Sequence, residues 1–324
     1  MLIKRTQTVS LKKKASFDQH PIVNMASFSS KEPVIYSVEH ETHYLYSHLV
    51  SHSKHLFRLL PVQDLSQTLL DYEFSVSEEG AEFSHFTGVF GNHATFLEIK
   101  HPYKQLIIKN RFIVAIHPTE LQLNLVHQPR TLPLVWMPWD RVMMAAYLQP
   151  PELPESELFQ LSEYAMSFVK KNNQDVYQIL LDINKTIYST YNYEPKSTNL
   201  NTTAYEVYSK KRGVCQDFAQ LLICLARLLD VPARYRTGYL FTGRSQLNQE
   251  QGDVTHAWVE VFLPYLGWIG LDPTNGCLAE NEHIRLACGR FYKDATPTSG
   301  AIFEADENIQ ESLSTTVRVE KLSS

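Results

Sequence analysis

The segment Gly213-Val214-Cys215-Gln216-Asp217-Phe218-Ala219 decides how this chain folds and what chemistry it can perform. A glycine stands before an apolar run with helical spacing, which predicts that a helix begins near the cysteine and ends near Asp230. The first turn of a helix favours negative charge, because its N–H groups lack internal partners and the helix dipole is positive there. A cysteine at this point is stabilised as thiolate, the nucleophilic form of sulfur.

A base and a group that could orient it follow Cys215 along the chain. His256 begins one predicted strand, and Asp272 lies near the end of the next. Histidine can act as general base and acid, and an aspartate can hold its tautomer. A four-residue turn between the strands would set His256 opposite Asn275, so a bulge or a longer loop must correct the register if His256 and Asp272 meet.

These residues resemble those of the transglutaminase-like superfamily, and in particular its bacterial transglutaminase-like cysteine peptidase branch. The resemblance covers roughly residues 34–303 and includes an N-terminal β domain with Phe90-Gly91-Asn92 near its middle. In the second half it runs through Pro195–Thr198, Lys211–Ala219, Pro232–Tyr239, Thr255–Glu260, Gly267–Gly276 and His283–Gly289. It implies a Cys215/His256/Asp272 catalytic triad.

Composition is that of a two-domain protein with substantial cores. The chain has 324 residues, of which 44% are apolar and 20% charged. A net charge of −5 gives no reason to expect a nucleic-acid or membrane partner. The basic start, residues 1–17, is followed by no apolar segment, so we expect no secretory signal and favour a cytoplasmic location. The oligomeric state stays open.

The four cysteines, all in the second half, form no CxxC pair, which argues against a disulfide scaffold and a Cys-rich zinc site. Cys224 lies nine positions after Cys215 and therefore on the opposite side of the helix, facing the core. Five histidines crowd residues 40–55, but strand neighbours three apart point to opposite faces, so we expect no metal site there. The expected chemistry needs no calcium and no organic cofactor.

The order of the predicted elements indicates an α+β fold of the papain-like or transglutaminase-like kind, with helices packed on an antiparallel sheet. We expect a flexible basic tail over residues 1–30 and a β-sandwich domain over 31–118. A Pro-rich junction follows at 119–154, and the catalytic domain takes residues 155–324. The expected strands are 34–46, 71–77, 81–90, 94–99, 105–116, 233–241, 256–263, 268–273 and 315–319, and the expected helices are 140–148, 158–169 and 176–191.

The oxyanion hole and the substrate pocket have weaker signals. The backbone N–H of Cys215 lies at a helix start and could stabilise a developing oxyanion, with Gln216 or a residue of the N-terminal half as the second donor. Trp258 and Tyr239 could form a wall of an acyl pocket. Aromatic residues beside a sheet are more often part of the core, and Gln216 also suits an ordinary first helical turn.

The predicted reaction is acyl transfer from an amide of a peptide or protein substrate, through a thioester on Cys215. Water as the second substrate would make the protein a cysteine peptidase or amidase, and a lysine-like amine would make it a transglutaminase. The resemblance favours hydrolysis of a peptide or isopeptide bond. A catalytically silent peptide-binding scaffold of the same fold is the alternative from a different class of function.

Overall fold

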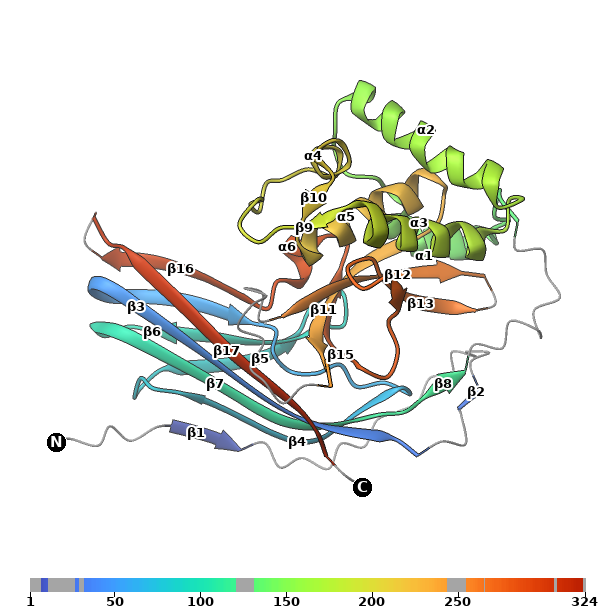
Figure 1. The fold of residues 1–324 in the computed structure, drawn as a ribbon. Coiled ribbons are helices and arrows are strands. Elements are labelled where there is room, and N and C mark those ends of the chain that lie inside the picture. Colours follow the sequence, from blue (N-terminus) through green and yellow to red (C-terminus); the bar gives the residue numbers. More distant parts are fainter. Residues whose placement is uncertain are drawn as a thin grey trace.

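The structure is a computed structural model that describes residues 7–10, 27–28, 32–120, 131–243, 255–264, 266–305 and 308–322. A large, curved β-sheet lies on one side, and a helical layer covers a smaller sheet on the other (Figure 1). The α+β transglutaminase-like fold with a β-rich N-terminal region is confirmed. None of the described helices is long and apolar enough to cross a membrane.

The N-terminal strands form one hydrogen-bonded sheet instead of two separate ones. Its first strands are β1 (Gln7–Ser10), β3 (Val34–Phe57), β4 (Gln67–Val76), β5 (Glu82–Thr87), β6 (His93–Ile99) and β7 (Tyr103–Ile116), in the order β1-β4-β7-β3-β6-β5. β3 is long enough to pair with β7 along its first half and with β6 along its end. β1 lies within the predicted tail, and most of residues 1–30 lie outside the described part of the chain. A separate short pair joins β2 (Ser27–Phe28) to β8 (Thr119–Glu120).

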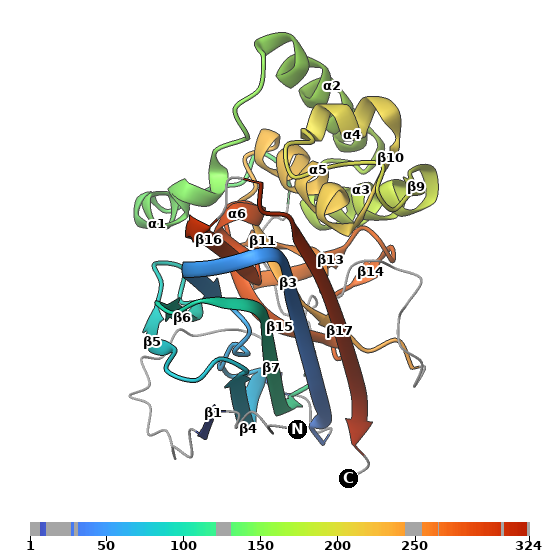
Figure 2. The same cartoon turned by 90° about the vertical axis from the view of Figure 1, so that its left-hand side faces the viewer.

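The chain returns to this first sheet at its C-terminal end. Strands β16 (Thr298–Ala305) and β17 (Glu311–Leu322) both pair antiparallel with β3 (Figure 2). The prediction that the whole of 155–324 belongs to the catalytic domain is therefore wrong for these strands. The physical reason is that β3 would otherwise present a long unpaired edge, and these two strands cover it.

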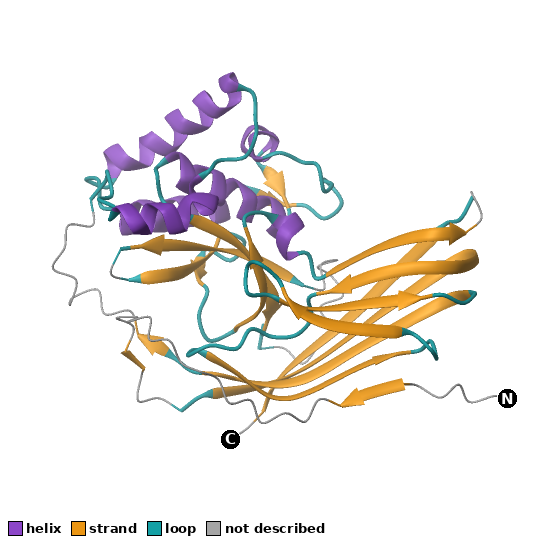
Figure 3. Ribbon diagram, turned by 180° about the vertical axis from the view of Figure 1, so that it is seen from behind, coloured by secondary structure: helices purple, strands orange, loops and turns teal. Residues whose placement is uncertain are grey.

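The C-terminal half has a helical layer on a five-stranded sheet (Figure 3). The helices are α1 (Pro138–Leu148), α2 (Glu155–Lys171), α3 (Val176–Thr190), α4 (Ala204–Lys210), α5 (Cys215–Leu228) and α6 (Tyr292–Ala295). The sheet has the order β14 (Cys277–Leu278), β13 (Gly267–Asp272), β12 (His256–Leu263), β11 (Ala233–Leu240) and β15 (His283–Gly289). A further parallel pair, β9 (Asn192–Tyr193) and β10 (Arg212–Gly213), leads into α5. Alternate β12 residues, among them Val259 and Val261, pack under α5 in one apolar core.

A second apolar core joins the two halves. It contains the inner residues of the large sheet together with Tyr239, Ile284 and Leu286 from β11 and β15. Hydrogen bonds fix the same contact. The Asn92 side chain donates to the Cys288 carbonyl at 2.6 Å and accepts from its N–H at 2.8 Å. Arg285 forms a bidentate ion pair with the Asp64 carboxylate, with N···O distances of 2.8 and 2.7 Å. The two halves are thus docked along the edge of β15 that pairs with no strand of its own sheet.

Gly238 provides a test of this packing because it lies opposite His256 in the β11–β12 ladder. A Cβ there would lie 1.9 Å from the Ile284 carbonyl oxygen and 2.6 Å from the Trp258 ring. We expect Gly238→Ala to lower the free energy of unfolding by about 3 kcal/mol, because neither backbone nor ring can give way.

Gly88→Ala is the matched control, since the nearest atom to its added Cβ lies at 3.8 Å. This variant should stay within about 0.5 kcal/mol of the native chain. Urea unfolding followed by tryptophan fluorescence measures both values. Equal stability of the two variants would contradict the close approach of β11, β15 and Trp258.

Candidate active site

The start of helix α5 holds Cys215 in place. Asp217, in the first turn, is 1% exposed, and its carboxylate accepts from the Val214 N–H at 2.9 Å and from the Thr198 hydroxyl at 2.6 Å. A Cβ on Gly213 would lie 2.8 Å from the Asp217 Cβ, so only glycine lets the chain approach the carboxylate this closely. The sequence around Cys215 therefore builds a capped helix start in which the thiol occupies the first helical position.

Cys215 is more buried than a helix-start residue is expected to be, with 4% of its surface exposed. It belongs to the apolar core beneath α5. Cys224 is fully buried on the same helix, as predicted, and burial raises the pKa of its thiol to about 12. The two thiols of α5 differ in what surrounds them, because a titratable partner, His256, lies beside Cys215.

The register of β12 and β13 differs from the predicted one. Leu263 pairs with Gly267, whereas a four-residue turn would pair it with Trp268. The ladder ends at the pair Val259–Leu271 and contains no bulge. The prediction that a bulge or longer loop brings His256 to Asp272 is therefore wrong. The loop is shorter, and the two side chains meet diagonally beyond the last ladder pair, with His256 Nε2 2.7 Å from Asp272 Oδ2.

Asp272 is fully buried and organises the turn that follows it. Its Oδ1 accepts from the backbone N–H groups of Thr274 and Asn275 at 2.9 and 3.2 Å. Its Oδ2 accepts from His256, from the Asn275 side chain at 2.7 Å and from His283 at 3.0 Å. Burial would raise the pKa of this carboxyl, but His256 and His283 outweigh burial and hold the pKa well below its usual range.

His256 stands between the carboxylate and the thiol. Because a carboxylate only accepts, the Nε2 of His256 carries a proton, and Nδ1 is left as the nitrogen for Cys215. Burial lowers the pKa of His256, yet Asp272 and a hydrogen bond with Cys215 outweigh it and raise the pKa to about 10. The structure thus brings together the three residues that the sequence singled out, with the imidazole charged at neutral pH.

The sequence did not predict that His283 takes part in this site. It lies on β15, is 5% exposed, and donates from Nε2 to the same oxygen of Asp272 as His256 does. Trp258 fills the space beside both imidazoles, with ring centroids 6.1 Å from His256 and 5.1 Å from His283. A single strand histidine gives no signal in sequence, and only the side-by-side pairing of β11 with β15 places it here.

The three predicted pocket residues have different outcomes. Gln216 is half-buried next to Cys215 and stays a candidate oxyanion donor. Trp258 is 1% exposed, so it supports the imidazoles from within the core and has no free surface for a substrate. Tyr239 does not line the site. Its hydroxyl bonds to His40 of β3 at 2.8 Å inside the core between the two halves.

The Tyr239 prediction is wrong because the pairing of β11 with β15 shifts between Thr237 and Gly238. Tyr235 faces the helices and Tyr239 faces the large sheet, although regular alternation would put both on one face. His40, one of the crowded histidines, is buried against Tyr239, and burial lowers its pKa to about 4.

The described residues contain one set that could hold a metal ion. His256, Asp272 and His283 each offer a ligand atom, and these atoms lie within 4.8 Å of one another. Both imidazoles already donate to the carboxylate, so a bound ion would have to displace both of these protons. These side chains are of the types that bind metal ions. Their hydrogen bonds, however, are those of a carboxylate that orients two histidines.

Comparison with known proteins agrees with this geometry. The Transglutaminase-like superfamily matches residues 163–273, and the Bacterial transglutaminase-like N-terminal region matches residues 36–115. An uncharacterised protein of Mycobacterium tuberculosis is 31% identical over 293 residues, which is 84% of this chain and 89% of that protein. The chain belongs to the transglutaminase-like superfamily.

Two further comparisons place this transglutaminase-like protein among its relatives. The crystal structure of "a Putative Cysteine Protease from Cytophaga hutchinsonii" has a TM-score of 0.73 at 24% identity and covers 91% of this chain and 92% of its own. The protein-glutamine gamma-glutamyltransferase of Pseudomonas aeruginosa is 31% identical over 88 residues, 26% of this chain and 13% of that protein. The first comparison shows that both halves of the fold recur together.

The raised pKa of His256 leads to a prediction that needs no substrate. In Asp272→Asn the carboxylate that favours the imidazolium is gone while burial stays, so the pKa of His256 should fall from about 10 to below about 6.5, its unperturbed value. The pKa falls because the Asp272 carboxylate stabilises the charged imidazolium, so without it the His256 ring loses its proton at a lower pH. Side-chain NMR titration of the ring measures the shift.

Cys224→Ala is the matched control for this titration, because it removes a thiol of the same helix that is not among the groups shifting His256. Its His256 should titrate as in the native protein. An unchanged His256 pKa in Asp272→Asn would show that the carboxylate does not govern the imidazole.

Proposed function

We propose that this protein is a cysteine peptidase or amidase that transfers the acyl group of an amide to Cys215 and then to water. The observation that carries the proposal is the position of His256 between the Cys215 thiol and the buried Asp272 carboxylate. In this arrangement the imidazole can hold the thiol proton, since its pKa of about 10 keeps it charged while sulfur is a thiolate. The helix start favours the same charge separation.

In the acylation step the Cys215 thiolate attacks the carbonyl carbon of a bound amide, and a C–S bond forms. The oxyanion that develops would be stabilised by the backbone N–H of Cys215 and by Gln216 beside it. His256 gives its Nδ1 proton to the amide nitrogen, the C–N bond breaks, and the amine leaves. Asp272 keeps its negative charge throughout and stabilises the imidazolium.

In the deacylation step water attacks the thioester carbonyl while Nδ1 of His256 takes its proton. A C–O bond forms, the C–S bond breaks, and the carboxylic acid product leaves with the thiolate–imidazolium pair restored. If an amine takes the place of water, the same steps yield a new amide, which is the transglutaminase reaction. The residues on either path are the same.

Hydrolysis is the first choice because the resemblance that covers both halves of the chain points to peptidases. The Cytophaga structure, named "a Putative Cysteine Protease", covers 91% of this chain, and the gamma-glutamyltransferase of Pseudomonas covers 26%. Products separate the two reactions directly. A peptide substrate incubated in the presence of a primary amine should yield free acid by mass spectrometry, and a predominance of the amine-linked product would assign the chain to transglutaminases.

Thiol labelling tests the proposal without a known substrate. Iodoacetamide near neutral pH should modify Cys215 more than about tenfold faster than the exposed Cys277, because an imidazolium pairs with the first sulfur. The thiol of Cys277 is protonated at that pH, since partial burial of this otherwise exposed residue, together with nearby carboxylates, raises its pKa to about 11. Peptide mapping after a timed quench gives both rates.

Two variants complete the test. Cys215→Ala should abolish turnover of any amide that the native protein cleaves, and Cys224→Ala should retain it while losing on the order of 1 kcal/mol of stability through a small cavity. Labelling of Cys215 no faster than that of Cys277 would support a silent scaffold instead. Full turnover by the folded Cys215→Ala variant would exclude a Cys215 nucleophile.

A further inference from the structure

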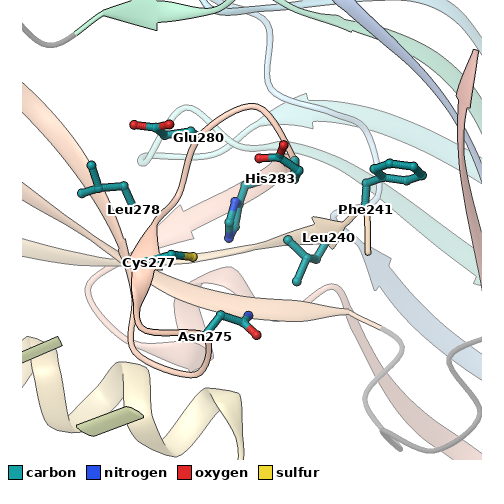
Figure 4. Close-up of a pocket in the computed structure, with 8 residues that line it drawn as sticks. Leu240, Phe241, Asn275, Cys277, Leu278, Glu280 and His283 are labelled. Carbon is teal, nitrogen blue, oxygen red and sulfur yellow. The ribbon is translucent and has the colours of Figure 1, made fainter. Parts of the chain in front are cut away.

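A cavity of about 450 Å³ opens next to the candidate active site. Two of the residues that line it, Asn275 and His283, hydrogen-bond to Asp272, so the cavity adjoins the base side of the Cys215/His256/Asp272 group. Figure 4 shows the His283 ring extending from β15 into the space between Cys277 and Leu240. The lining residues are Leu240, Phe241, Asn275, Cys277, Leu278, Glu280, Glu282 and His283.

The lining has a single sign of charge. Glu280 and Glu282 are exposed at the cavity, and among the residues that the structure describes the lining contains neither lysine nor arginine. The pKa of the Cys277 thiol is raised first by burial and then by the negative charges of Asp272, Glu282 and Glu280. Negative charge is therefore disfavoured inside the cavity, and positive charge is favoured.

Two side chains of the cavity lining carry hydrogen-bond acceptors. His283 donates from Nε2 to Asp272, and its Nδ1, buried on a residue that is 5% exposed, has no hydrogen-bond partner among the described residues. In the neutral ring that nitrogen is a lone acceptor. Asn275 donates its amide N–H to Asp272, which leaves its carbonyl oxygen as an acceptor as well. A ligand that supplies N–H donors would satisfy these groups.

The walls are apolar. Leu240, Phe241 and Leu278 line the cavity beside the acceptors and carboxylates. This combination suits a side chain with an aliphatic stem and a cationic end, since the stem packs on the apolar wall while the charge meets carboxylates. An acidic side chain would meet repulsion, and a purely apolar one would leave the acceptors unpaired.

We propose that this cavity binds a lysine or arginine side chain of the peptide substrate, next to the amide that Cys215 attacks. The inference rests on the proposed function for what the neighbouring thiol does, while binding itself can be measured separately. Asn275 and His283 line the cavity and bond to the carboxylate that holds His256, so a side chain bound there lies close to the reacting group.

Cys277 makes the test possible because its thiol lines the cavity. The rate of its modification by methyl methanethiosulfonate, a small neutral reagent, is measured by peptide mapping. The competitors are three capped tripeptide amides, Ala-Lys-Ala, Ala-norleucine-Ala and Ala-Glu-Ala, each at about 10 mM, above the roughly millimolar affinity expected for one side chain. The lysine peptide should slow modification of Cys277 and of Cys215 severalfold, with the same half-saturating concentration.

The double variant Glu280→Gln/Glu282→Gln should lose most of this protection, because it removes the charge and keeps the shape. Glu152→Gln/Glu155→Gln, two exposed carboxylates outside the cavity lining, is the matched control and should keep the protection. Both pairs lie outside the Cys215/His256/Asp272 group, so fast labelling of Cys215 by iodoacetamide should persist in both variants.

Three results would overturn the inference. Equal protection by the lysine and norleucine peptides would show that the cavity does not distinguish a charged side chain from an apolar one. Protection of neither thiol would show that the cavity binds no peptide side chain. Protection by free butylamine as strong as by the lysine peptide would assign the cavity to an acceptor amine instead. Failure of the proposed function is seen separately, as slow labelling of Cys215 with the protection of Cys277 intact.

Discussion

The rest of the site depends on the buried carboxylate of Asp272. It accepts hydrogen bonds from two histidines, from an asparagine side chain and from two backbone N–H groups, all while fully shielded from water. A buried charge is stable only when it is paired and hydrogen-bonded in this way. The same contacts fix the ring orientation of His256 and stabilise its imidazolium beside Cys215, so a single ionised group couples the turn after β13 to the thiol at the start of α5.

The N-terminal half supports this arrangement through β15, the strand that carries His283. Side chains of Asn92 and Gln67 bind the backbone of Cys288 and Arg285 on that strand, and the apolar core between the sheets buries Ile284. These contacts occupy backbone groups that an edge strand would otherwise leave open. Docking of the two halves thus positions the second histidine that donates to Asp272, which gives the β-rich half a physical part in the site.

The sequence predicted the helix start at Cys215, the base at His256 and the carboxylate at Asp272, because each has a local signal in residue type and order. Most strands and helices were predicted for the same reason. What failed depended on pairing between distant segments. The return of β17 to β3, the shift that turns Tyr239 away from the site, and the arrival of His283 beside Asp272 are set by partners far along the chain. A loop one residue shorter than expected set the His256 register.

The central claim is that Cys215 becomes acylated with the help of His256, and a trapped acyl-enzyme tests it most directly. The native protein is mixed with an activated ester, N-acetylphenylalanine p-nitrophenyl ester, quenched in acid within seconds, and mapped by mass spectrometry. The account predicts one acyl group on Cys215, released by hydroxylamine as a thioester is, and formed far more slowly in His256→Ala. Acylation at another residue, or an unchanged rate in His256→Ala, would contradict it.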